Sequence, residues 1–138
     1  MELVLVTNKP LDTQAIIKSV ESPDGGAVNV FIGTVRNATK GKAVLKLEFE
    51  AYEPMATKEL TKIVKRAKSK WPILKVVVHH RTGVMQIGEV PVVIAVATAH
   101  RGAGFEACQF IIDTLKETVP IWKKEFFKDG EVWVAAHP

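Results

Sequence analysis

The sequence contains few of the features that mark secreted or membrane proteins. Among 138 residues there is one cysteine, Cys108, so no disulfide can form within the chain. No apolar run approaches the roughly 20 residues that a membrane-spanning helix requires, and no basic leader with an apolar core precedes the first expected strand. We therefore expect a soluble protein of the reducing cytoplasm.

Several motifs of common catalytic sites are also missing. A Walker loop and a GxGxxG segment are both absent, so nucleotide activation is expected elsewhere. His79 and His80 are neighbours in an expected strand and should point to opposite faces, so they cannot form one side of a metal site together. Cys108 falls on the apolar stripe of an expected helix, which favours a buried thiol over a nucleophile. We expect neither a metal nor a cofactor.

What is present indicates one domain over residues 1–138. Hydrophobic residues make up 47% of the chain, which is enough for a core that is stable without a disulfide or a structural metal. The net charge of +4 is compatible with an anionic ligand, an acidic partner or nucleic acid, but such an excess is also common in proteins that bind none of these. The placement of the charges is therefore more informative than their sum.

Helices and strands are expected to alternate without a regular βαβ rhythm. This favours an α+β fold with a mixed, mostly antiparallel sheet and flanking helices over a doubly wound parallel fold. The expected strands are Glu2–Val6, a central strand Ala27–Val35, Leu45–Tyr52, Ile73–His80, the VPVVIAVATA run before His100, and Glu131–Ala135. The expected helices follow Asp12, Pro54 and the glycines Gly102 and Gly104.

Apolar spacing predicts which faces are buried. In the strand that begins at Leu45, the expected inner residues are Leu45, Leu47, Phe49 and Ala51. In the two longer helices they are Met55, Leu60, Ile63, Val64, Ala67, and then Phe105, Cys108, Ile111, Ile112, Leu115 and Val119. The first of these helices also has a basic outer face with no interleaved aromatic residue, which favours a solvated surface over a nucleic-acid site.

Cationic residues gather in the segment Thr98–Glu125. His100 and Arg101 end a buried strand, Lys116 lies near the last turn of the next helix, and Lys123 and Lys124 follow the helix-stopping Pro120. We expect Arg101, Lys116 and one of the later lysines to share a space that would hold an anion. An ordinary solvated surface explains the same pattern.

A similar arrangement occurs earlier, where an expected strand ends at Arg36 and Asn37. The following segment, RNATKGK, is polar, basic and contains Gly41. It is either a plain hairpin loop or a lid over an anionic ligand.

Four motifs carry a resemblance to a known family: FIGTVRN (31–37), LEFEAYEPMA (47–56), HHRTGVMQIGE (79–89) and AHRGAGFEACQFIIDTLKETVPIWKKE (99–125). In this order, and over nearly the whole chain, they resemble the large, catalytic subunit of molybdopterin synthase. The resemblance implies an α/β hammerhead fold. It also implies conversion of cyclic pyranopterin monophosphate into molybdopterin, with sulfur supplied as a thiocarboxylate on the C-terminal glycine of a small ubiquitin-like subunit.

The resemblance assigns roles to individual residues. Arg36, His100 and Arg101 match positions that bind the pterin phosphate, and Lys116 and Lys123 match the catalytic lysines, which also contact substrate. It further implies a homodimer within a heterotetramer, in which the neighbouring chain contributes a basic residue near its C-terminus. His137 stands where an arginine is expected. A non-catalytic module that binds an acidic or ubiquitin-like tail is the alternative.

Overall fold

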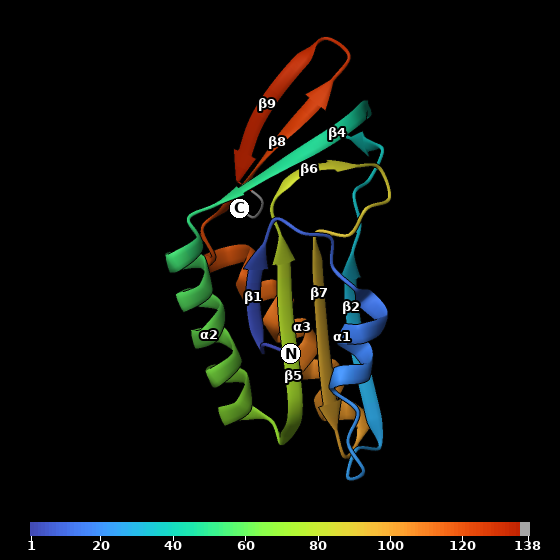
Figure 1. Ribbon diagram of the computed structural model, residues 1–138, viewed down its shortest axis with the longest axis vertical. Coiled ribbons are helices and arrows are strands. Elements are labelled where there is room, and N and C mark those ends of the chain that lie inside the picture. Colours follow the sequence, from blue (N-terminus) through green and yellow to red (C-terminus); the bar gives the residue numbers. More distant parts are fainter. Residues whose placement is uncertain (136–138) are drawn as a thin grey trace.

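The computed structural model describes residues 1–135 and contains two sheets, one set across the end of the other (Figure 1). The first sheet has the strand order β1-β5-β7-β2, and the second is built on β4. The elements in chain order are β1 (Val4–Thr7), α1 (Thr13–Ser19), β2 (Ala27–Gly33), β3 (Ala38–Thr39), β4 (Lys42–Ala51), α2 (Glu53–Lys70), β5 (Ile73–Arg81), β6 (Gly83–Gln86), β7 (Val92–Thr98), α3 (Arg101–Thr118), β8 (Ile121–Phe127) and β9 (Gly130–Ala135).

The first sheet is covered on both faces. Its strand β7 is buried along its whole length, as its β-branched sequence predicts. On one face, Ile16 and Val20 from the α1 region pack against Val77, Val93 and small residues of β7. On the other face, α2 and α3 pack against the sheet and against each other, and this layer forms the larger core.

The second sheet gives the fold its hammerhead shape. β4 pairs antiparallel with β8 from Val44↔Phe127 to Ala51↔Ile121, and β9 continues the sheet beyond β8. β3 and β6 pair with β4 as well. Among the pairs of described strands, only β1–β5 is parallel. The expected α+β class, with mostly antiparallel pairing and flanking helices, is confirmed.

Local signals placed several boundaries correctly. The Asp12 carboxylate accepts a hydrogen bond from the Ala15 backbone N–H at 3.0 Å and caps α1. Pro54 lies in the first turn of α2, where no intrahelical donor is lost. Helix α3 ends at Thr118, two residues before Pro120, as that proline requires.

Three expected core residues lie on the surface instead. Met55 is 46% exposed and Phe105 is 61% exposed. Their places on the inner faces of α2 and α3 are taken by the smaller neighbours Ala56 and Ala107, because small side chains let a helix approach its neighbours closely. Leu45 is exposed because the pairing of β4 with β8 shifts register between Val44 and Lys46, which turns Val44 inward in its place.

The strand order also corrects three expectations. The segment expected as a central strand from residue 27 to 35 is the edge strand β2, and it ends at Gly33. The residues after Thr82 form the short strand β6 and those after Pro120 form β8, two strands that the expected elements lacked. Neither sequence alternates clearly between apolar and polar residues. Both segments form strands because they pair with β4.

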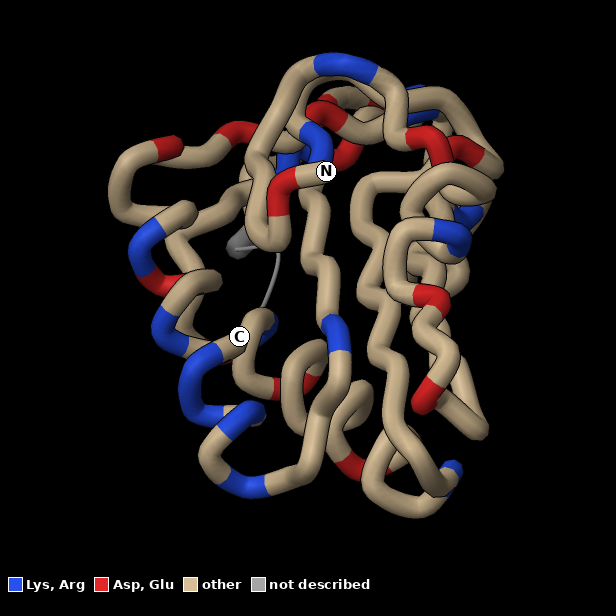
Figure 2. Tube along the Cα trace, turned by 60° about the horizontal axis from the view of Figure 1, so that its bottom comes forward, with Lys and Arg blue, Asp and Glu red and all other residues tan. Residues whose placement is uncertain are grey.

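Charge is concentrated on one helix. Figure 2 shows lysines and arginines following one another along α2, on the side away from the sheet.

Among the described residues, no helix is both long and apolar enough to cross a membrane.

Candidate functional site

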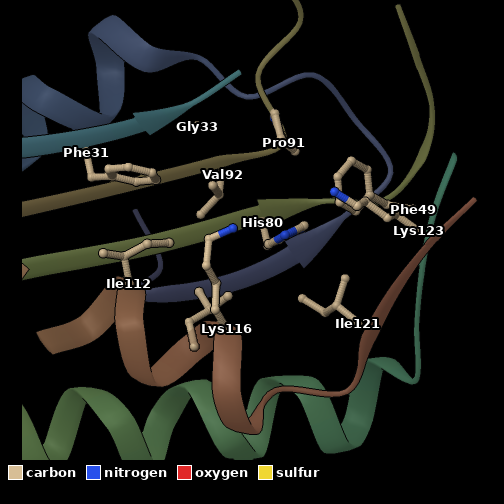
Figure 3. Close-up of a pocket in the computed structure, with 11 residues that line it drawn as sticks. Phe31, Gly33, Phe49, His80, Pro91, Val92, Ile112, Lys116, Ile121 and Lys123 are labelled. Atoms are coloured by element: carbon tan, nitrogen blue, oxygen red, sulfur yellow. The ribbon is translucent and has the colours of Figure 1, made fainter. Parts of the chain in front are cut away.

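A narrow pocket of about 80 Å³ opens where the end of α3 meets both sheets (Figure 3). Most of its wall is apolar, and its polar side chains are His80, Lys116 and Lys123. The apolar wall consists of Phe31, Gly33, Phe49, Pro91, Val92, Ile112, Leu115 and Ile121. The pocket therefore combines a dry lining with a few polar groups, which is typical of a ligand site.

The two lysines reach the pocket from consecutive elements. Lys116 is in the last turn of α3, and Lys123 is the third residue of β8, directly opposite Phe49 of β4. Lys124 points to the other face of β8, where its Nζ lies 4.6 Å from the centre of the Trp133 ring. Of these two lysines, Lys123 is therefore the one that belongs to the pocket.

The electrostatics of the pocket are unbalanced. Partial burial lowers the pKa of Lys116 below its ordinary value, and the positive charges of Lys123 and Arg36 lower it further. No acidic side chain is among the described residues that line the pocket. Cations held together without a counterion favour the binding of an anion from outside.

Arg36 adds a third positive charge near the two lysines. It lies three residues beyond the end of β2, is exposed, and is close enough to act on Lys116 electrostatically. The following loop is fixed to the second sheet, because the Thr39 hydroxyl donates to the buried Glu125 carboxylate at 2.5 Å. The structure thus brings together Arg36, Lys116 and Lys123.

His100 and Arg101 lie at the opposite end of α3. His100 is the N-cap and Arg101 the first residue of the helix, and both line a separate surface cleft with Phe105. Arg101 and Lys116 are 15 positions apart in the helix, which corresponds to about 22 Å along its axis. Within one chain, the expected shared space for Arg101 and Lys116 is therefore wrong, because a straight helix separates them.

Two other sequence-based candidates have clear places. Burial raises the pKa of the Cys108 thiol to about 11, which agrees with a buried, unreactive cysteine. His80 also lines the pocket. The family resemblance gave this histidine no role. The alternation within β5 could have identified it, since it faces away from His79. His137 lies outside the described residues.

Fold and pocket together define a class: a small α+β protein with a narrow cationic pocket between its two sheets. Comparison with known proteins identifies the group within that class. The chain belongs to the MoaE protein family, which matches residues 6–118.

Several similar proteins share one description. The chain is 48% identical over 134 residues to the molybdopterin synthase catalytic subunit of Bacillus subtilis, which covers 97% of this chain and 85% of that protein. It is 42% identical over 132 residues to the human molybdopterin synthase catalytic subunit, covering 96% of this chain and 70% of the relative. The crystal structure of molybdopterin synthase from Staphylococcus aureus matches with a TM-score of 0.92 and 40% identity, over 97% of this chain and 98% of that one. The resemblance and the fold that it implied are confirmed.

Proposed function

We propose that this chain, a single domain over residues 1–138, is the cytoplasmic catalytic subunit of a molybdopterin synthase. It transfers sulfur from the C-terminal thiocarboxylate of a small ubiquitin-like subunit to cyclic pyranopterin monophosphate, forming the dithiolene of molybdopterin. The observation that carries this proposal is the pair Lys116 and Lys123 in a narrow pocket that has no acidic side chain among its described lining residues. The description shared by its relatives supports it.

The width of the pocket favours the sulfur donor as its occupant. A volume of about 80 Å³ is far below the roughly 300–1,000 Å³ of sites that enclose a whole drug-sized ligand. It suits the end of an extended glycine tail, because glycine has no side chain and adopts extended conformations freely. The tail's thiocarboxylate is then held by Lys116 and Lys123, and the larger pterin lies at the mouth.

The lowered pKa of Lys116 supports a role in proton transfer. A lysine that is partly desolvated and surrounded by positive charge exchanges its proton more readily near neutral pH. In each of the two transfers that a dithiolene needs, a carbon–sulfur bond replaces a carbon–oxygen bond on the pterin side chain. Water then cleaves the acyl–sulfur bond, and the tail leaves as a carboxylate. Lys116 and Lys123 stabilise the negative charge on the donor and move protons as these bonds change.

A second copy of the chain would reunite the cationic residues that α3 separates. An apolar groove runs between β2 and α3, lined by Val30, Phe31, Phe105, Cys108 and Ile112 among others. It lies between the His100–Arg101 cleft and the lysine pocket. If two copies pack across this groove about a two-fold axis, Arg101 of each approaches Lys116 of the other.

In this arrangement, each site contains residues of both chains. One chain contributes Arg36, Lys116 and Lys123, and its partner contributes His100 and Arg101. The arginines suit the pterin phosphate, because a guanidinium can hold phosphate oxygens in two places. One small subunit docks at each pocket, which gives a heterotetramer around a central dimer of this chain.

The direct test is to mix the purified protein with thiocarboxylated small subunit and cyclic pyranopterin monophosphate, and to measure dithiolene product. Binding of the small subunit without product formation would favour the alternative, a non-catalytic tail-binding module. A second test addresses the site shared between chains. Co-expressed Lys116→Ala and Arg101→Ala chains should form mixed dimers with one intact site, and so recover activity that neither variant has alone. No recovery in isolated mixed dimers would refute the shared site.

A further inference from the structure

One polar group in the pocket has no part in the mechanism so far. His80 of β5 is 3% exposed and lines the pocket with Lys116 and Lys123. Figure 3 shows the Lys116 side chain extending from the end of α3 toward the strand that carries the His80 ring. On its other side the ring packs against Phe49, with centroids 5.5 Å apart and planes at 67°. Packing therefore fixes the position of the imidazole.

A hydrogen bond fixes its tautomer. Nδ1 of His80 lies 2.9 Å from the backbone carbonyl oxygen of Arg81. A carbonyl oxygen can only accept, so Nδ1 carries the hydrogen and Nε2 of the neutral ring has a free lone pair. Burial and, to a smaller extent, the nearby charge of Lys116 lower the pKa of His80 to about 4 despite this bond. The ring stays neutral at physiological pH, and Nε2 remains an acceptor.

This acceptor is distinctive among the groups that line the pocket. The described lining contains three polar side chains, and the two lysines can only donate. Nε2 of His80 is therefore the one side-chain acceptor in that lining, and it makes no hydrogen bond to any described residue. An anion satisfies the lysines but offers nothing to Nε2. The lining is thus complementary to a ligand that carries a hydrogen-bond donor next to its negative charge.

We propose that Nε2 of His80 accepts a hydrogen bond from the peptide N–H of the tail's terminal glycine, while Lys116 and Lys123 bind its thiocarboxylate. The assignment rests on the proposed function. In a terminal glycine, a single Cα separates the N–H from the carboxyl carbon, so both groups fit within one narrow cavity. His80 is then a substrate-contacting residue that distinguishes a peptide end from a simple carboxylate or phosphate.

The test removes the donor from the tail and the acceptor from the pocket. Small subunit with an ordinary C-terminal glycine carboxylate is compared with semisynthetic small subunit that ends in N-methylglycine, and binding to the full-length protein is measured by calorimetry. Loss of one hydrogen bond should weaken binding to the wild type by about 2- to 12-fold. The variant His80→Phe keeps an aromatic ring against Phe49 but has no acceptor. In this variant, N-methylation of the tail should not weaken binding. A steric clash of the methyl group would instead persist in both proteins.

Three further variants sharpen the result. His80→Gln can place an acceptor near the position of Nε2 and should keep the N-methylation penalty. His80→Asn can supply the donor toward the Arg81 carbonyl, but its shorter side chain cannot place an acceptor at the position of Nε2, so it should lose that penalty. The matched control is His79→Phe: His79 is also buried but faces the other side of β5, where its Nε2 lies 2.7 Å from the Glu2 carbonyl oxygen. This control should keep the penalty.

An equal penalty in the wild type and in His80→Phe would overturn the proposal. The absence of any penalty in the wild type would overturn it as well, even if no His80 variant folded. Failure of the proposed function looks different: the unmodified small subunit would not bind, or Lys116→Ala would bind it as tightly as the wild type does.

Discussion

Two groups of cations on this molecule differ in what surrounds them. Helix α2 exposes many lysines and arginines along one face. In the pocket, the lysines and arginines among the described lining residues are Lys116 and Lys123, with Arg36 nearby. On α2, Lys62 pairs with Glu59 at 3.2 Å, and Arg66 and Lys70 lie over the Phe110 ring at 5.1 and 4.4 Å.

The difference shows that the number of charges does not identify a site. The α2 cations are solvated, screened by salt and partly satisfied by their neighbours, so they have little need of a ligand. The pocket lysines are fewer but partly desolvated, and no carboxylate lines their pocket among the described residues. Four predictions test this contrast, from the largest expected effect to the smallest.

Removing a pocket lysine should have the largest effect. Lys116→Ala and Lys123→Ala should each lower sulfur transfer by about 10²- to 10⁴-fold while the fold is kept, because a positioned proton-transfer group is lost. Single-turnover assays with thiocarboxylated small subunit measure this. Lys124→Ala is the matched control, since it removes the next lysine on the opposite face of β8, and it should stay close to wild type. Near-normal turnover in both pocket variants would remove the basis of the mechanism.

The buried histidine should make stability depend on pH. Its pKa is about 4 in the folded protein and 6.5 in the unfolded chain, so the unfolded state takes up a proton first as the pH falls. The free energy of unfolding should therefore decrease between pH 6.5 and 4, by an amount on the order of 3 kcal/mol from this group. Denaturant unfolding of wild type and His80→Phe across this range isolates the contribution. Parallel pH profiles for the two proteins would contradict the prediction.

Loss of the proposed phosphate contact should have an intermediate effect. Arg101→Ala should weaken pterin binding by about 1.5–3 kcal/mol, the value of a charge-assisted hydrogen bond, and should affect binding of the small subunit less. Calorimetry with each ligand separately measures the two losses. If they are equal, the assignment of Arg101 to the phosphate is wrong.

Substitutions on the basic helix should matter least. Lys62→Ala and Lys65→Ala should change stability by no more than about 0.5 kcal/mol and leave turnover and partner binding unchanged, because both side chains are solvated. Thermal unfolding and the sulfur-transfer assay check this. A strong defect in partner binding would mean that α2 is a docking surface and that the contrast with the pocket does not hold.

Local rules predicted much of the fold. The cap at Asp12 and the helix boundaries at Pro54 and Pro120 depend on neighbouring residues alone, and all three are confirmed. The errors at Leu45 and Phe105 arose where tertiary structure decides: a register shift in β4 exposes the first, and close helix packing excludes the second. The edge position of β2 likewise depends on strand order, which apolar spacing does not encode.

The site was predictable only in part, because its residues are brought together by tertiary structure. Lys116 and Lys123 were identified through the family motif, and the structure places them in one pocket. The expected elements already put His100 and Arg101 before the helix and Lys116 in its last turn. The error was to expect one shared space, because a straight helix of this length holds its two ends about 22 Å apart. His80 was missed because a histidine within an apolar strand is usually part of the core.

The corner between α3 and β8 has a consequence for how the pocket is maintained. Only the six residues from 117 to 122 separate Lys116 from Lys123, and within the corner the Val119 N–H donates to the Leu115 carbonyl and the Ile121 N–H to that of Val119. Pro120 restricts the backbone between these two bonds. One short, stiff segment thus sets the spacing of the two lysines. The conformational entropy of this segment is lost during folding, before any ligand binds. Binding the donor tail therefore needs no loop closure to bring the two ammonium groups together.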